Sequence, residues 1–257
     1  MTEMPVSTIR KTIREKLHMK PYKIHFSQQL FTDDRAARVV MCNDFQQRIA
    51  SDDNFLSRLC FSDEATFHLS GHVNRHNCVV WGTQNPHVVE EVPIKSPGVT
   101  VWCAMFRDVI IGPYFFDSTV TSKAYKKMLE EYLVPELRRR RRLRTTIFQQ
   151  DGAPPHWSLE VRAFLNQNFP ARWIGRDGPS HWSARSPDLS PLDFYLWGFI
   201  KDRVYRRRPS SLSELHDFIE EEVMAVPVDC LPGVFSNFER RLRLCLREGG
   251  GHFEQYL

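Results

Sequence analysis

The sequence of 257 residues is long enough for one large domain or two small ones, and length alone does not choose between them. Hydrophobic residues make up 42% and charged residues 26% of the chain, which excludes a disordered polymer, and no apolar run reaches the length of a membrane-spanning helix. The N-terminus lacks the basic start and apolar middle of a signal peptide, so we expect an intracellular protein with no membrane partner.

The net charge of +4 is unevenly placed along the chain. Residues 1–25 hold six Lys or Arg against two Glu, and further basic clusters lie at Arg138–Arg144 and Tyr205–Pro209. Such clusters suit a polyanion such as nucleic acid, and they are equally typical of solvated helix faces. The six cysteines are scattered without a C-x-x-C pair, which favours reduced, mostly buried thiols over a zinc ribbon or a disulfide framework.

The N-terminal region predicts two helices. The first has apolar residues at helical spacing and a basic outer face, with Val6, Ile9, Ile13 and Leu17 as its apolar positions. The second is expected from about residue 32 to 49, with Thr32 as its cap and Ala36, Val40 and Met41 among its apolar positions. This basic helical segment, 1–50, is too short to be a complete domain by itself.

The pattern changes to strands from residue 59. Strands are predicted at 59–69 and 77–82, followed by a long polar connection at 83–98. Two further strands, 99–106 and 109–116, read as a hairpin that turns at Arg107-Asp108.

Strands and helices then alternate. A helix from about Ser122 is kinked or restarted at Pro135, and a strand at 145–150, a helix at about 156–168, a short strand at 172–175 and a helix near Pro191 follow. Two amphipathic helices end the chain, one capped by Ser211 or Ser213 and one ended by the glycines at 249–251. This order predicts an α/β fold in which helices cover a mixed sheet.

Three carboxylates are placed where a site could form. Asp63 lies within a strand whose neighbours favour burial, so its charge needs a cation, a hydrogen-bonding shell or a metal ion. Asp151 ends a strand, and Gly152 and two prolines force the chain away before His156. Asp193 falls in the first turn of a helix, where the helix dipole keeps a carboxylate ionised; Asp188 competes with it, and spacing alone does not decide between them.

Each of these residues also has a plain structural interpretation. Asp63 could be satisfied by backbone amides, Asp-Gly is a common turn dipeptide, and a first-turn Asp often serves only the helix dipole. Taken together, three carboxylates from two strands and a helix start are the ligands of a site for two divalent metal ions. Two Mg²⁺ ions can activate an attacking hydroxyl and stabilise a leaving oxygen in phosphodiester chemistry, and the basic clusters would hold the DNA backbone.

The segments FSDEATFHLSGHVNRHN, FQQDGAPPHWS and ARSPDLSPLDFYLWG closely resemble, in order, the catalytic blocks of mariner-like cut-and-paste transposases. The resemblance extends from about Arg10 to Tyr205. It implies an RNase-H-like fold, cleavage of double-stranded DNA at transposon ends, and transfer of the freed strand to target DNA. It implies a catalytic and metal-binding triad of Asp63, Asp151 and Asp193, two Mg²⁺ or Mn²⁺ ions, and supporting roles for His156 and Asp188.

The resemblance also implies a homodimer that bridges two DNA ends, action in the nucleus and no small-molecule substrate. We expect phosphate contacts from the basic residues Arg10, Lys11, Arg14, Lys20, Lys23, Arg138, Arg139, Arg206 and Arg207. The expected division is a helical remnant of a helix-turn-helix module at 1–50, a catalytic domain at 51–208, and C-terminal helices at 209–257 packing on it.

Family members carry two helix-turn-helix modules before the catalytic domain, and residues 6–23 resemble only the end of the second. We therefore expect a truncated chain without full recognition of terminal repeats. The competing hypothesis is a transposon-derived protein that binds nucleic acid or dimerises without catalysis. His68, His72, His76 and Cys78 are poorly spaced for a zinc site.

Overall fold

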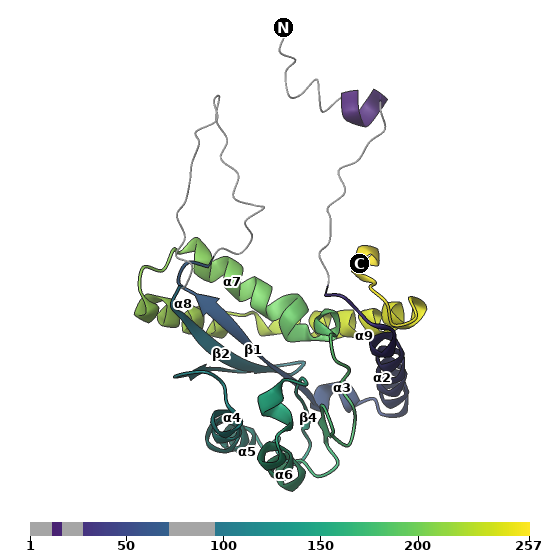
Figure 1. Ribbon diagram of the computed structural model, residues 1–257, viewed down its shortest axis with the longest axis horizontal. Helices are drawn as coiled ribbons and strands as arrows, with labels where there is room; N and C mark the ends of the chain where they lie inside the picture. The colour runs from purple at the N-terminus through teal and green to yellow at the C-terminus, as the bar shows by residue number, and fades with distance from the viewer. Residues whose placement is uncertain (1–11, 17–27, 72–95) are drawn as a thin grey trace.

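A five-stranded mixed sheet forms the centre of the computed structural model, which describes residues 12–16, 28–71 and 96–257 (Figure 1). The strand order is β3-β2-β1-β4-β5. The strands are β1 (Leu59–His68), β2 (Gly98–Met105), β3 (Ile110–Phe116), β4 (Ile147–Gln149) and β5 (Trp173–Ile174). β1, β2 and β3 pair antiparallel, whereas β4 runs parallel to both β1 and β5. The predicted α/β fold with a mixed sheet is confirmed.

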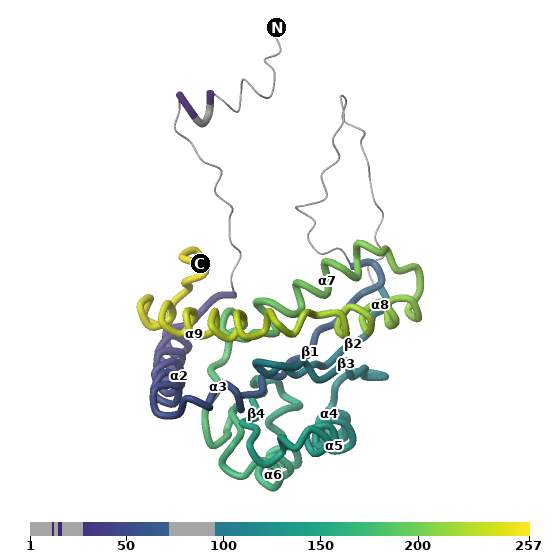
Figure 2. The backbone as a smooth tube through the Cα atoms, turned by 180° about the vertical axis from the view of Figure 1, so that it is seen from behind, coloured from purple at the N-terminus to yellow at the C-terminus, as the bar shows by residue number. Residues whose placement is uncertain are grey.

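Helices cover both faces of this sheet. They are α2 (Thr32–Ser51), α3 (Phe55–Arg58), α4 (Ser122–Met128), α5 (Val134–Arg139), α6 (Leu159–Asn168), α7 (Trp197–Arg206), α8 (Leu212–Met224) and α9 (Leu231–Arg247). A helical turn at Leu129–Leu133 joins α4 to α5, and another at Leu192–Leu196 leads into α7. Single turns lie at Thr12–Lys16, Pro154–Trp157, Pro187–Leu189, Val228–Cys230 and Glu254–Tyr256. Figures 1 and 2 show α4, α5 and α6 on one side of the sheet and α7, α8 and α9 on the other.

The alternation of side chains along β1 creates two hydrophobic cores. Phe61, Ala65 and Phe67 face the larger core with α2, α7, α8 and α9, whereas Cys60 faces the smaller core with α4, α5 and α6. Because successive side chains of a strand point to opposite faces, each polar residue of β1 is also assigned to one face. Asp63 therefore points to the side of α7, and Glu64 to the side of α4 and α6.

Helix α2 belongs to the larger core through Met41, Cys42 and Phe45. The predicted apolar face of this helix was partly wrong, because Val40 is 70% exposed while Arg38 is fully buried. Ala36 is also exposed, and Thr32 is the first helical residue and not the cap. The residue at the cap position is Phe31, whose N–H donates to the carboxylate of Asp34 at 2.9 Å.

Several local predictions are confirmed. The hairpin of β2 and β3 turns at Arg107-Asp108, with the Phe106 N–H donating to the Val109 carbonyl at 2.8 Å. Ser211 caps α8 by accepting from the Glu214 N–H at 3.2 Å, and α9 ends just before its glycines. The five cysteines that the structure describes are free, and four of them are buried.

Other predictions fall on residues that the structure leaves undescribed. These are the strand at 77–82, most of the connection at 83–98, the candidate zinc ligands beyond His68, and most of the first helix, of which only the turn Thr12–Lys16 is described. The division at residues 50 and 208 stays a prediction, although α2, α8 and α9 all contribute to the larger core. No helix in the described ranges is both long and apolar enough to cross a membrane.

The glycines after α9 provide a test of this packing. Gly250 has φ +79°, and a Cβ atom there would lie 2.1 Å from the Arg35 carbonyl oxygen, whereas Gly249 has φ +59° and open space around it. We expect Gly249→Ala to lower the free energy of unfolding by about 1 kcal/mol and Gly250→Ala by about 3 kcal/mol or more, because only the second adds a clash with α2 to the left-handed strain. Urea denaturation measures both, and equal losses would contradict the close approach of this turn to α2.

Candidate active site

The pairing of β1 with β4 brings Asp63 and Asp151 together. The two strands are parallel, and Phe61 lies opposite Gln149. Each aspartate lies two residues beyond its member of this pair, Asp63 still within β1 and Asp151 just after the end of β4. Neighbouring strands are about 4.8 Å apart. The register therefore places these two predicted residues side by side.

Asp193 lines the same cleft, and it comes from the start of the helix that leads into α7. It lies in the helical turn Leu192–Leu196, which follows Pro191 and continues into α7. The cleft has a volume of about 410 Å³, and Asp63, Asp151 and Asp193 all line it. The structure thus gathers the three predicted carboxylates around one opening.

Asp63 is held by α7 and has a strongly shifted pKa. The Trp197 indole N–H donates to Asp63 Oδ2 at 2.7 Å. Burial and then the charge of Asp193 raise the pKa of Asp63 well above its ordinary value. A cation that entered the cleft would relieve both effects.

Lys201 is the cation that α7 already supplies. It lies eight residues after Asp193, and Trp197 lies midway, so the three share one helix face. Burial lowers the pKa of Lys201, although the charges of Asp193 and Asp63 act in the opposite direction. The sequence analysis did not identify Trp197 and Lys201, although they lie four and eight residues after Asp193, at helical spacing.

Asp151 is held by a buried histidine that bridges two carboxylates. His156 Nδ1 lies 2.5 Å from Asp151 Oδ1, and His156 Nε2 lies 3.3 Å from Glu64 Oε2. Burial acts to lower the pKa of His156, but the two carboxylates raise it to about 10, so the ring is a cation at neutral pH. Burial acts to raise the pKa of Asp151, yet the contact with His156 and the Ala153 N–H hold it below its ordinary value.

The turn Pro154–Trp157 folds the chain back so that His156 lies under Asp151. The His156 ring stacks on Tyr125 with the centroids 4.0 Å apart, and the His156 carbonyl accepts from Gln150 Nε2 at 2.8 Å. The Tyr125 hydroxyl in turn lies 3.0 Å from Gln150 Oε1. The sequence analysis did not identify Glu64. Because Glu64 follows Asp63 on β1, its side chain points to the opposite face of the sheet, where His156 lies.

Asp193 is the second carboxylate of the cleft whose pKa is raised. Withdrawal of water raises its pKa to about 6; Ser190 lowers the value and the charge of Asp151 raises it. The side chain itself stays accessible at the edge of the cleft. The site thus combines one anion balanced by His156 with two carboxylates that lack a comparable counter-charge.

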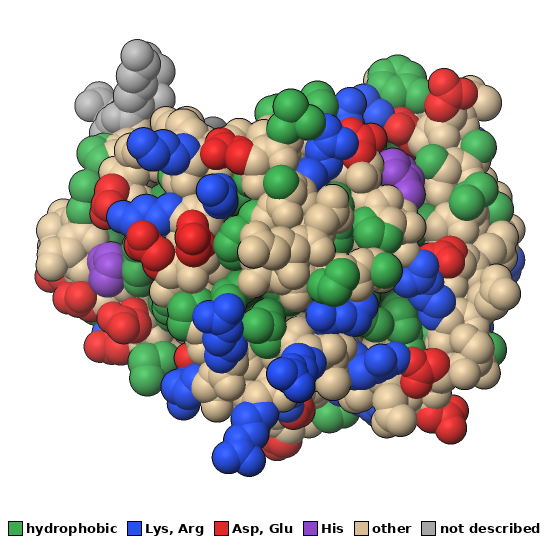
Figure 3. Space-filling model, turned by 90° about the horizontal axis from the view of Figure 1, so that it is seen from below, with side chains coloured by type: hydrophobic (Ala, Val, Ile, Leu, Met, Phe, Trp, Pro, Cys, Tyr) green, Lys and Arg blue, Asp and Glu red, His purple; other side chains and the backbone are tan. Residues whose placement is uncertain are grey.

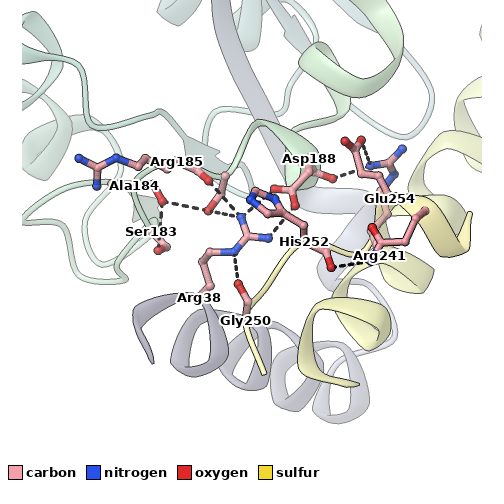
Figure 4. Close-up of polar contacts among 11 residues, drawn as sticks. Arg38, Ser183, Ala184, Arg185, Asp188, Arg241, Gly250, His252 and Glu254 are labelled. Carbon is pink, nitrogen blue, oxygen red and sulfur yellow. Dashed lines mark hydrogen bonds and ion pairs between the residues drawn. The ribbon is translucent and has the colours of Figure 1, made fainter. Parts of the chain in front are cut away.

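Asp188 is committed to a different contact. Arg38 of α2 donates to both of its carboxylate oxygens, at 2.7 and 2.6 Å, and Arg241 of α9 donates to its carbonyl at 2.7 Å (Figure 4). Because both of its oxygens accept from a buried guanidinium, Asp188 is poorly placed to bind a metal ion. The spacing did not decide whether Asp188 or Asp193 is the candidate metal ligand, and the contacts of Asp188 favour Asp193.

The donor set fits a hard divalent cation. Among the described residues, no three Asp, Glu, His or Cys side chains converge closely enough to hold one ion between them. Asp63 and Asp151 each use one oxygen in the contacts with Trp197 and His156, so the other oxygen of each takes no part in these contacts. Glu64 Oε1 is buried without a hydrogen-bond partner in the described part of the chain. Carboxylate oxygens with this excess of negative charge are ligands that Mg²⁺ and Mn²⁺ accept.

The predicted phosphate-contacting arginines differ in their surroundings. Arg138 is exposed, whereas Arg139, Arg206 and Arg207 form ion pairs with Glu136, Asp202 and Glu221 at 2.7, 2.6 and 2.6 Å. The side chains of Arg10, Lys11, Arg14, Lys20 and Lys23 lie outside the described part of the chain.

Two curated proteins of Caenorhabditis elegans are similar to this chain in sequence. The transposase of transposable element Tc3 is 28% identical over 199 residues, which cover 76% of this chain and 57% of the relative. The transposase of element Tc1 is 28% identical over 104 residues, which cover 40% of this chain and 35% of the relative. The chain thus spans about half the length, or less, of these relatives. No family model matches the chain.

Solved structures of Mos1 transposase share the fold. The paired-end complex of Mos1 with the left transposon end gives a TM-score of 0.78 at 20% identity, covering 96% of this chain and 71% of that chain. The catalytic domain of Mos1 mariner transposase gives a TM-score of 0.68 at 20% identity, covering 90% of this chain and all of the domain. The comparisons confirm both the resemblance to mariner-like transposases and the RNase-H-like fold.

Proposed function

We propose that this chain is a transposase-type, metal-dependent DNA endonuclease and strand transferase. The observation that carries the proposal is the register of β1 and β4, which sets Asp63 beside Asp151 at the cleft that Asp193 also lines. The relatives named Tc3 and Tc1 transposase and the fold shared with Mos1 support the same reaction class. The substrate is double-stranded DNA at transposon ends, followed by target DNA.

The cofactor that this site suits is Mg²⁺ or Mn²⁺, with two ions held by Asp63, Asp151 and Asp193. Structures of Mos1 transposase with Mn and with Mg are among the structures that this fold matches. When bound, such ions activate the attacking oxygen and stabilise the leaving oxygen of a phosphodiester. The raised pKa of Asp63 and of Asp193 supports this proposal, since burial and neighbouring charges penalise their ionised forms and a cation would offset that penalty.

The chain's own groups orient the carboxylates. His156 holds Asp151 on one side and Glu64 on the other, so the Asp151 carboxylate keeps one orientation. Trp197 does the same for Asp63 by donating to one of its oxygens. Lys201 lies close enough to Asp193 and Asp63 to compensate part of their charge. These contacts support a positioning role for His156 and for Trp197, and a charge-compensating role for Lys201.

The DNA backbone needs cations outside the cleft as well. Figure 3 shows Lys and Arg side chains interspersed with acidic ones on the face seen from below. Arg138, which has no ion-pair partner among the described residues, is the best of the four predicted contacts in this part of the chain. Two bound DNA ends require two active sites, so we also propose a homodimer, acting in the nucleus where its DNA lies.

Removal of Asp151 tests the catalytic proposal. We expect the full chain to cleave DNA with Mg²⁺ or Mn²⁺ and Asp151→Asn to lower the rate by about a hundredfold or more, because one ligand that both orients and charges the site is lost. A nicking assay on supercoiled plasmid measures this, with Asp117→Asn, at an exposed position just after β3, as the control. Equal rates in both variants, or binding of DNA without cleavage under either metal, would favour the non-catalytic alternative.

Replacement of Asp63 tests the electrostatics of the cleft. Because burial and neighbouring carboxylates disfavour its charge, we expect Asp63→Asn to raise the melting temperature of the metal-free protein. The wild type should gain about 2.7 kcal/mol of stability from Mn²⁺ at one hundred times its dissociation constant. Because Asp63→Asn removes a metal ligand, we expect this variant to lose most of that gain. Differential scanning calorimetry measures both effects, with the exposed Asp117→Asn as control. A lower melting temperature without metal, or an unchanged response to Mn²⁺, would refute this assignment.

The two neighbouring arginines of α5 provide a matched test of DNA contact. We expect Arg138→Ala to weaken binding to all DNA sequences alike and to reduce the slope of log affinity against log salt by about 1, as loss of a phosphate contact does. Arg139→Ala is expected to have a smaller effect, because Arg139 pairs with Glu136. Fluorescence anisotropy at several salt concentrations distinguishes them, and equal slopes in all three proteins would exclude Arg138 as a contact.

A further inference from the structure

One face of α2 lies along the irregular segment 180–188, which forms a wall of the cleft. Asp34 pairs with Arg185 at 2.7 Å, and the Met41 sulfur accepts from the Ser183 N–H at 3.1 Å. Farther along the same face, Phe45 packs edge-to-face on Trp182, with centroids 5.9 Å apart, and Arg48 donates to the Ser180 hydroxyl. Together with Arg38, the helix residues 34, 41, 45 and 48 recur at spacings of three and four, so they share one face. This face determines the path of a segment that has little regular structure of its own.

Arg38 is the central contact on this face. Its side chain is fully buried and donates to both oxygens of Asp188, to the Ser186 hydroxyl at 3.1 Å and to the Arg185 carbonyl at 3.1 Å. Its Nε donates to the Gly250 carbonyl at 2.8 Å (Figure 4). A planar guanidinium with this many acceptors has one possible orientation. The bidentate pair therefore fixes the position of the Asp188 carboxylate.

The position of Asp188 is passed on to Asp193 through a short, rigid stretch. Asp188 lies in the turn Pro187–Leu189, Pro191 fixes the backbone that follows, and the Phe194 N–H donates to the Ser190 carbonyl at 2.9 Å. Arg241 holds the Asp188 carbonyl from the opposite side, at 2.7 Å. A shift of Asp188 would consequently move the start of the helix that presents Asp193.

We propose that Arg38 is a positioning residue for Asp193, acting through its bidentate contact with Asp188. The inference rests on the proposed function, in which Asp193 is a metal ligand. Stability alone does not explain the pair, because an apolar pair of similar volume often stabilises a core as well as a buried ion pair does. What the ion pair adds is a defined geometry, and residues that orient metal ligands typically change metal affinity when they are altered.

The test uses the full chain and two variants of the pair. Arg38→Lys keeps the charge and loses the planar fork, and the double variant Arg38→Met/Asp188→Leu removes both charges without leaving one of them buried alone. The control is Leu165→Ala in α6, which disturbs the smaller core on the opposite face of the sheet and does not touch the segment 180–190. Circular dichroism selects a temperature at which all four proteins are folded.

Two measurements are made on each protein: the dissociation constant for Mn²⁺ by electron paramagnetic resonance, and hydrogen exchange in peptides that cover 186–196. We expect both variants of the pair to bind Mn²⁺ about tenfold more weakly or worse, and to exchange faster at 190–196 while β4 stays protected. Leu165→Ala is expected to keep the wild-type Mn²⁺ affinity and protection at 190–196. Wild-type affinity and exchange in the double variant would overturn the positioning role.

The two proposals fail in different ways. If Asp193→Asn binds Mn²⁺ as the wild type does, the metal assignment of the proposed function is wrong, and unchanged exchange at 190–196 in the variants of the pair then refutes the positioning as well. If Asp193→Asn abolishes binding but Arg38→Lys and the double variant bind normally, the metal site stands and the positioning role falls.

Discussion

The parallel pairing of β1 with β4 is the constraint on which the rest of the site depends. It sets Phe61 opposite Gln149, and two residues later it brings Asp63 and Asp151 to the same cleft. A shift of one residue in either strand would send one carboxylate to the opposite face. Such a shift is opposed by the two cores, because Phe61, Ala65 and Phe67 of β1 pack in the larger core and Cys60 packs in the smaller one. Hydrophobic burial thus fixes the spacing of two charged groups that would repel each other in isolation.

The protein balances this repulsion unevenly. Asp151 has His156 as an internal counter-charge, and its pKa lies below the ordinary value, whereas the pKa of Asp63 and that of Asp193 are raised. Burying like charges without compensation costs free energy, so the cleft is poised to accept cations. The contacts around the carboxylates matter equally. His156 restricts the orientation of Asp151 and Trp197 that of Asp63, whereas Asp188 lies in the segment that leads to Asp193.

Much of the fold could be predicted from local patterns. The segments 59–69 and 145–150 have the residue pattern of strands and contain β1 and β4, Ser211 has a clear capping position, and the glycines at 249–251 mark the end of α9. The pattern failed in α2, where Arg38 and Asp34 are buried and Val40 is exposed. Those residues are buried because their partners, Asp188 and Arg185, come from a segment about 150 residues away in the chain, as the sequence separations of these contacts show. The contact of Arg38 with Asp188 also favours Asp193 over Asp188 as the candidate metal ligand. Local spacing in the sequence could not predict this preference, because the two partners are 150 residues apart.

The most direct test of the central claim is the location of bound metal. Crystals of the full chain soaked in Mn²⁺ would give anomalous scattering wherever the ion binds. The account predicts density within the cleft, at coordination distance from carboxylate oxygens of Asp63, Asp151 and Asp193, with Asp188 still paired to Arg38. Density absent from the cleft at saturating Mn²⁺, or an ion bound by Asp188 in place of Asp193, would contradict it.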